Sequence, residues 1–275
     1  MDDGEDTSST APDWVYWMGC AASYDPRVGA IARATAKVLG AAGIRLRFLG
    51  AEEACSGDAA RRLGEEGLFQ QLALQNIDTL RRHGAQRIVT HCAHCFHVLK
   101  NEYPRFGGEF EVMHHSELIA SLLEQGRIRL RRDESVPATL HDSCYVGRYN
   151  QIFDAPRAVL RAVYGDALVE MPRHGERSFC CGGGGANYWY DVAKKESAGT
   201  LRIKEAVGTG ARVIVAECPF CIKMLAQGAQ TAAVDSGLQI KDIAEIVAEA
   251  LDHDGASETS DDSAEPTPPN EGESI

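Results

Sequence analysis

RIVTHCAHC at residues 87–95 and RVIVAECPFC at residues 212–221 each place a CxxC pair directly after a short apolar run. The runs 86–90 and 212–216 have the length and composition of buried strands, and Pro219 suits the first position of a helix. A strand that ends at thiols and is followed by a helix is part of an α/β unit. The two stretches therefore predict α/β units with cysteines at the carboxyl ends of their strands.

Further cysteines precede each CxxC pair, and the nine cysteines of the chain form two copies of one pattern. The first copy has Cys20, Cys55, Cys92 and Cys95, and the second has Cys144, Cys180, Cys181, Cys218 and Cys221. If Cys181 is matched to Cys55, corresponding cysteines are 124 or 126 residues apart, and Ala54 stands where the second copy has Cys180. A repeat of this kind indicates duplication, and the sulfurs of each copy are predicted to act together.

Apolar patterns alternate between strand and helix in both halves. Predicted strands are 14–19, 44–49, 86–90, 110–113, 138–141, 167–171 and 212–216, and predicted helices are 25–42, 58–82, 116–124, 156–164, 191–207 and 240–251, with others starting near 93 and 219. This order predicts an α/β fold of two tandem doubly wound, Rossmann-like units with parallel sheets. We expect a first cysteine-rich domain at 14–130 and a second at 137–252, joined by the charged stretch 127–137.

Charge is concentrated at the two ends. Residues 1–13 carry five acids and residues 253–275 carry seven, with no Lys or Arg in either, so the rest has 28 basic and 28 acidic residues. Both ends are poor in large apolar residues and are predicted to be disordered acidic tails. The neutral remainder gives no support for a nucleic-acid partner. Without a signal sequence or apolar span we expect a cytoplasmic protein, in which repeated CxxC groups hold metal or perform redox chemistry.

The number of thiols limits the metal. Five in the second copy exceed the four that tetrahedral zinc binds, which favours an iron-sulfur cluster with additional thiolates. Four in the first copy fit either a cluster or zinc. A histidine such as His91, His94 or His141 could replace the missing thiolate or relay protons, although hydrogen bonding to the site is the commoner role. A closed zinc site and a metal-free dithiol oxidoreductase are the alternatives.

A glycine run follows the paired cysteines. Gly182, Gly183 and Gly184 would let backbone amides approach sulfur or a bound substrate, so we assign them to cofactor binding, against the alternative of a flexible loop. No G-x-G-x-x-G register is present, which excludes a dinucleotide fingerprint. The sequence assigns no catalytic residue.

The pattern, with Cys-Cys-Gly at 180–182, resembles the duplicated cysteine-rich (CCG) domain of heterodisulfide reductase B subunits and related iron-sulfur subunits over about residues 14–252. YWMGC at 16–20, ACSGDAARR at 54–62, HCAHCFHVLKNEYPRFGG at 91–108 and VMHHSE at 112–117 look closer to the cysteine-rich half of membrane-associated electron-transfer flavoprotein:quinone oxidoreductases. The resemblance implies a non-cubane [4Fe-4S] cluster on the second set of cysteines. For the first set it implies a cluster site, with [4Fe-4S] or zinc as the occupant.

The resemblance also implies a function. An iron-sulfur oxidoreductase of this kind would take electrons from electron-transfer flavoprotein or another flavoprotein and pass them toward a membrane haem or quinone-reactive subunit. Its place would be cytoplasmic or peripheral at the inner face of the membrane. A subunit for heterodisulfide reduction, or for lactate or glycerol-3-phosphate oxidation, and a non-catalytic zinc protein are the alternatives.

Overall fold

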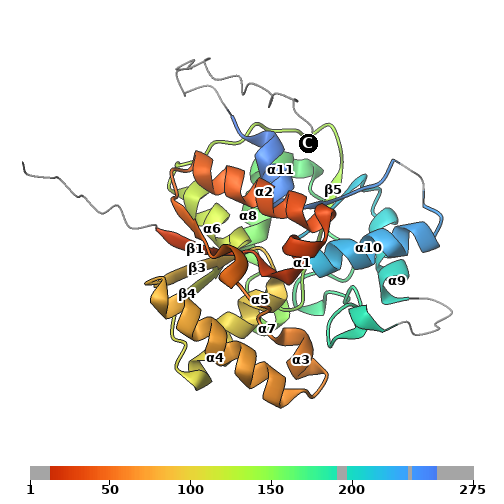
Figure 1. Cartoon of the computed structure of the whole chain (residues 1–275). Coiled ribbons are helices and arrows are strands. Elements are labelled where there is room, and N and C mark those ends of the chain that lie inside the picture. The colour runs from red at the N-terminus through yellow and green to blue at the C-terminus, as the bar shows by residue number, and fades with distance from the viewer. Residues whose placement is uncertain (1–12, 191–196, 235–236, 253–275) are drawn as a thin grey trace, which may run out of the picture.

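The computed structural model describes residues 13–190, 197–234 and 237–252 (Figure 1). The predicted tails lie outside these residues, apart from Asp13. The first copy contains β1 (Trp14–Trp17), α1 (Gly19–Tyr24), α2 (Pro26–Ala41), β2 (Leu46–Phe48), α3 (Asp58–Arg62), α4 (Glu66–Arg82), β3 (Arg87–Thr90), α5 (Ala93–His97), β4 (Glu111–His114) and α6 (His115–Glu124). The second contains β5 (Ala138–His141), α7 (Gly147–Asn150), α8 (Asp154–Tyr164), α9 (Ala198–Val207), β6 (Val213–Ala216), α10 (Pro219–Thr231), β7 (Gln239–Asp242) and α11 (Ile243–Ala250).

Each copy is built on one parallel sheet. The first sheet has the order β2-β1-β3-β4 and the second β5-β6-β7, and every pair of neighbouring strands is parallel. This confirms the predicted α/β class with two tandem units. Because all strands of a sheet point the same way, their carboxyl ends, where the cysteines follow, share one edge.

Four predicted elements differ from the structure. The first residues of the predicted helix 240–251 belong to strand β7, which pairs with β6, and helix α11 begins only at Ile243. The predicted helix 58–82 is two helices, α3 and α4, which are separated around Gly64, whose φ is +86°. The predicted strand 167–171 is reduced to one parallel bridge between Ala138 and Leu168, so the second sheet has three strands. The predicted helix 191–207 is described only from Ser197, whose side chain caps α9 by accepting a hydrogen bond from the Thr200 amide.

The two copies share one hydrophobic core. A single buried cluster contains Trp14 and Val89 from the first sheet together with Ala138, Val215 and Ile243 from the second copy. Helix α2 packs on α11 and α6 packs on α8, and the first of these pairs is seen side by side in Figure 1. The packing holds the two cysteine-bearing edges in a fixed relation. Among the described helices, none combines the length and apolar character that crossing a membrane requires.

Candidate metal centre

All nine cysteines are free thiols, and they lie at or near the carboxyl ends of the strands. Cys20 follows β1 in α1, and Cys144 follows β5. Each CxxC pair lies at the start of the helix after the central strand of its sheet, on α5 in the first copy and on α10 in the second. The remaining thiols lie on loops. The strand-to-helix turns thus bring distant parts of the sequence together, as the repeat predicted.

In the first set the thiols contact one another in pairs. The side chain of Cys20 interacts with that of Cys55, and the side chain of Cys92 interacts with that of Cys95. The Cys95 sulfur also lies close to the backbone of Gly19, where an added Cβ would be 3.3 Å from it. Cys20, Cys55 and Cys95 line one small cavity, so three of the four first-set cysteines share one space.

The second set forms a continuous chain of thiols. Neighbouring side chains interact in the order Cys144, Cys180, Cys181, Cys221 and Cys218. Three of the five side chains belong to residues at most 3% exposed, namely Cys181, Cys218 and Cys221. The five thiols that the sequence assigned to the second copy are therefore adjacent in space.

The two sets meet at their CxxC pairs. The Cys92 and Cys218 sulfurs lie within 4.8 Å of each other, and Nδ1 of His94 lies 3.5 Å from the Cys218 sulfur. The His94 ring packs edge to face on Tyr145 and Phe220, with centroids 4.9 and 4.8 Å away. A histidine from the first copy thus contacts the second set of thiols.

Hydrogen bonding and burial separate the pKa values of the thiols. The hydrogen bond from Cys20 lowers the pKa of Cys55 to about 6, and the hydrogen bonds from Cys144 and then Cys181 lower that of Cys180. The same bonds and burial raise the pKa of Cys20 and Cys144 well above the usual value. Each set therefore holds an anionic sulfur beside neutral thiols that lose their protons when a metal binds. Soft anionic donors in this number fit an iron-sulfur cluster, and four of them also fit zinc.

The loops that carry the cysteines show how the copies correspond. The Gly57 amide donates to the Cys55 sulfur at 3.4 Å, and the Gly182 amide donates to the Cys180 sulfur at 3.2 Å. Both glycines have φ of +90°. Because the turns are the same, Cys55 corresponds to Cys180, an offset of 125 residues. The expectation that Ala54 replaces Cys180 is wrong, because sequence offsets alone could not fix the register of a loop.

The glycine run packs against its surroundings with little space. A Cβ on Gly182 would lie 2.9 Å from the Ala198 Cβ, and one on Gly183 would lie 2.9 Å from Cγ of Met224. Gly183 also lines a small cavity of about 60 Å³ that borders Cys20, Cys55 and Cys95. The run therefore contacts the second set of thiols and borders a cavity that the first set also lines.

Gly182→Ala is expected to weaken metal retention at the second site and to destabilise the fold by roughly 1–3 kcal/mol, from the left-handed φ and the contact with α9. Gly64→Ala is the matched control, because it has φ of +86° but no atom within 4 Å of the added Cβ. Metal content and urea unfolding should separate the two variants. Equal effects would show that strain, and not the contact, matters.

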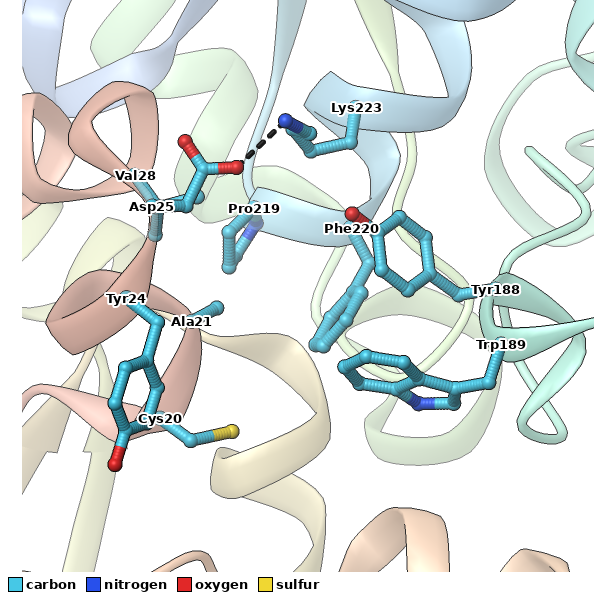
Figure 2. A pocket seen from close by; sticks show the side chains of 10 residues that line it. All are labelled: Cys20, Ala21, Tyr24, Asp25, Val28, Tyr188, Trp189, Pro219, Phe220 and Lys223. Atoms are coloured by element: carbon cyan, nitrogen blue, oxygen red, sulfur yellow. Dashed lines mark hydrogen bonds and ion pairs between the residues drawn. The ribbon is translucent and has the colours of Figure 1, made fainter.

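A larger pocket of about 360 Å³ reaches the first set from the surface. Figure 2 shows the Cys20 sulfur and Tyr24 on one side and Phe220, Tyr188 and Trp189 on the other. An ion pair between Lys223 Nζ and Asp25 Oδ2, 2.5 Å long, joins the two copies at its rim. The lining is otherwise mostly apolar and aromatic, so this pocket gives Cys20 an accessible approach.

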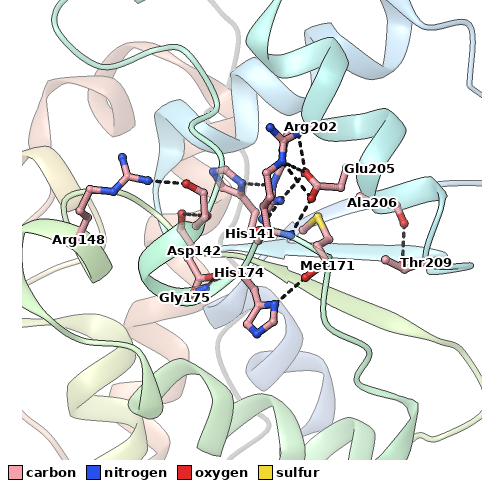
Figure 3. A network of polar contacts seen from close by, with 12 residues as sticks. His141, Asp142, Arg148, Met171, His174, Gly175, Arg202, Glu205, Ala206 and Thr209 are labelled. Carbon is pink, nitrogen blue, oxygen red and sulfur yellow. Dashed lines mark hydrogen bonds and ion pairs between the residues drawn. The ribbon is translucent and has the colours of Figure 1, made fainter.

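A buried arginine orients a histidine at the second set (Figure 3). Arg202 Nε donates to Nδ1 of His141 at 3.1 Å, and both residues are at most 1% exposed. Since a guanidinium only donates, the ring proton is on Nε2. A ring nitrogen of His141 lies within 4.8 Å of the Cys181 and Cys221 sulfurs, and burial followed by Arg202 lowers its pKa to about 4. His141 is therefore a neutral ring held beside two of the second-set thiols.

Two of these supporting residues were not predicted. Arg202 gave no signal in the sequence, because arginine on an amphipathic helix usually faces solvent. The Glu53 carboxylate accepts hydrogen bonds from the amides of Met18 at 3.0 Å and Gly19 at 2.5 Å, which fixes the loop before Cys20. The position of Glu53 two residues before Cys55 was the sequence feature that could have indicated this role.

His91, which the sequence also offered as a candidate, is hydrogen-bonded through Nδ1 to Tyr16 at 2.8 Å.

Comparison with known proteins agrees with this grouping of the cysteines. The family model described as "Cysteine-rich domain" (CCG) matches residues 14–100 and 138–226. A "Probable membrane-anchored ferredoxin" of Chromohalobacter salexigens is 46% identical over 86% of this chain, and an "EtfAB:quinone oxidoreductase" of Syntrophomonas wolfei is 36% identical over 87%. One of the subunits of the dihydromethanophenazine:CoB--CoM heterodisulfide reductase of Methanosarcina mazei is 38% identical over 87%. The chain covers 36%, 34% and 59% of these proteins respectively.

Proposed function

The chain belongs to the cysteine-rich domain (CCG) family, and we propose that it is an iron-sulfur oxidoreductase chain that transfers electrons. The observation that carries the proposal is the gathering of nine free thiols, in two contacting sets, where two parallel sheets end. Three relatives have names that include ferredoxin, quinone oxidoreductase or heterodisulfide reductase. Each of these names describes redox chemistry.

The proposed cofactors are a non-cubane [4Fe-4S] cluster held by the five second-set cysteines and a [4Fe-4S] cluster or zinc held by the four of the first set. A bound cluster would supply one-electron redox chemistry. The chain supplies the anionic sulfurs, the Gly182 amide that donates to Cys180, and the buried His141 ring beside Cys181 and Cys221. Such donors stabilise negative charge on sulfur and tune a metal site.

The contact between the sets supports electron transfer between the two sites. The Cys92 and Cys218 sulfurs lie within 4.8 Å of each other across the two copies, so the two sets of donors adjoin there. We place the redox-active centre on the second set. Electrons would enter from electron-transfer flavoprotein or another flavoprotein and leave toward a membrane haem or quinone-reactive partner. The names of the quinone oxidoreductase and membrane-anchored ferredoxin relatives support this direction and a peripheral position at the membrane.

Anaerobic purification followed by iron, sulfide and zinc analysis, with visible and EPR spectra, tests the cofactors. We expect iron and sulfide in the protein and an EPR signal that changes when the protein is reduced. Near-zero iron after reconstitution, with zinc in the first set, would instead support a structural metal protein. For the direction, reduced electron-transfer flavoprotein should bleach the visible spectrum of the oxidised chain, and no bleaching would exclude that donor.

A further inference from the structure

Residue 56 occupies a ligand position of the duplicated site. The turns Cys55-Ser56-Gly57 and Cys180-Cys181-Gly182 have the same amide-to-sulfur hydrogen bond and the same left-handed glycine. Their first cysteines also have corresponding partners, since the Cys55 side chain interacts with Cys20 and the Cys180 side chain interacts with Cys144. The middle residues of the two turns, Ser56 and Cys181, are therefore equivalent.

The partners of the middle residues agree with this correspondence. Oγ of Ser56 is 3.4 Å from the Cys95 sulfur, and the Cys181 sulfur lies within 4.8 Å of the Cys221 sulfur. Cys95 and Cys221 are the second cysteines of the two CxxC pairs. Both Ser56 and Cys181 are buried, at 2% and 3% exposure. The hydroxyl thus lies where the second copy has its fifth thiol.

The surroundings fix Ser56 in this place. Its carbonyl accepts a hydrogen bond from the Tyr103 hydroxyl at 3.1 Å. Asn76 donates to that same hydroxyl at 3.0 Å and to the Cys55 carbonyl at 2.9 Å. A buried turn braced in this way keeps its geometry when one side-chain oxygen is replaced by sulfur, so the exchange of serine for cysteine is a local change.

We propose that residue 56 sets the ligand number of the first site: Ser56 leaves four thiolates there, and Ser56→Cys converts it to a five-thiolate site like the second. The proposal rests on the proposed binding of iron-sulfur clusters. A serine hydroxyl is not ionised at neutral pH and donates to the Cys95 sulfur, whereas a cysteine can lose its proton to a metal. The two sites of the chain therefore differ in ligand set because of one atom.

The experiment compares the EPR spectra and the iron and sulfide content of the full chain, purified anaerobically, with those of three variants. Ser56→Cys is expected to increase the intensity of the five-thiolate signal about twofold. Cys181→Ser, the reciprocal change, should remove that signal while the second site keeps iron or gains zinc on its four remaining thiols. Ser56→Ala retains the four first-set thiols and should leave the five-thiolate signal unchanged.

The outcomes separate this proposal from the proposed function. If the unchanged chain contains no iron after reconstitution, the proposed function fails. If it contains iron, but Ser56→Cys retains its metal without any added five-thiolate signal, residue 56 is not a ligand position and the present proposal is overturned. Should Ser56→Cys fail to fold, Cys181→Ser decides: persistence of the five-thiolate signal in that variant contradicts the equivalence.

Discussion

Replacing Cys218 by serine is expected to remove the metal from the second site and also to change the EPR spectrum of the first. Cys218 is fully buried and interacts both with Cys221 in its own set and with Cys92 in the other. Serine is a harder donor that does not ionise at neutral pH, so the second site loses the ligand that adjoins the first. Loss of a residue that merely supports a metal ligand already costs about 10–100-fold in affinity, and loss of a ligand should cost more.

Cys144→Ser is the matched control for this prediction. It also removes one thiol from the second set, but the thiols with which Cys144 interacts, Cys180 first among them, belong to the same set. We therefore expect second-site metal to fall in both variants, while the first-site spectrum changes only when Cys218 is replaced. Identical first-site spectra in the two variants would mean that the contact between Cys92 and Cys218 does not couple the sites.

The sequence was sufficient to predict the parallel α/β units and the grouping of the thiols, because strand periodicity and cysteine spacing are local patterns. The correspondence of Ser56 with Cys181 could not be predicted, since the offset between copies drifts from 124 to 126 residues and a loop can absorb the change at any position. The contact of Cys92 with Cys218 depends on how the two copies pack. That packing is determined by the shared core, which no single stretch of sequence encodes.

Arg157 also gave no sequence signal, and its environment predicts a large effect on stability. Its guanidinium, 7% exposed as a residue, makes two hydrogen bonds to Asp142 at 2.7 and 3.1 Å and two to Glu170 at 2.7 and 3.0 Å. Asp142, 3% exposed, precedes Cys144 by two residues and also accepts a hydrogen bond from the Gly175 amide. The ion pair therefore supports the loop that presents a metal ligand.

Arg157→Met is expected to lower the free energy of unfolding by about 3–5 kcal/mol, because it leaves the Asp142 carboxylate buried without its counter-ion. Arg132→Met is the control: its ion pair with Glu134 is 2.8 Å long, but the arginine side chain is 69% exposed, and loss of such a pair costs about 0–1 kcal/mol. Urea unfolding under anaerobic conditions gives both values. A loss for Arg157→Met no larger than that of the control would show that Asp142 finds another partner.

The loss of stability in Arg157→Met should depend on pH through the pKa of Asp142. Burial alone would raise that pKa, but the hydrogen bonds and charge of Arg157 outweigh it and hold the pKa below its usual value of 3.8. A carboxyl group with a depressed folded-state pKa stabilises the fold above its unfolded pKa, and this contribution is lost as the pH falls through the folded value. In Arg157→Met the Asp142 carboxyl group stays buried without its counter-ion, so its pKa rises. Protonation of this carboxyl group at lower pH then removes the free-energy cost of burying its charge. The difference in free energy of unfolding between the variant and the unchanged chain should therefore become smaller from about pH 7.5 to about pH 5. A difference that becomes larger over this range would contradict the role given to Asp142.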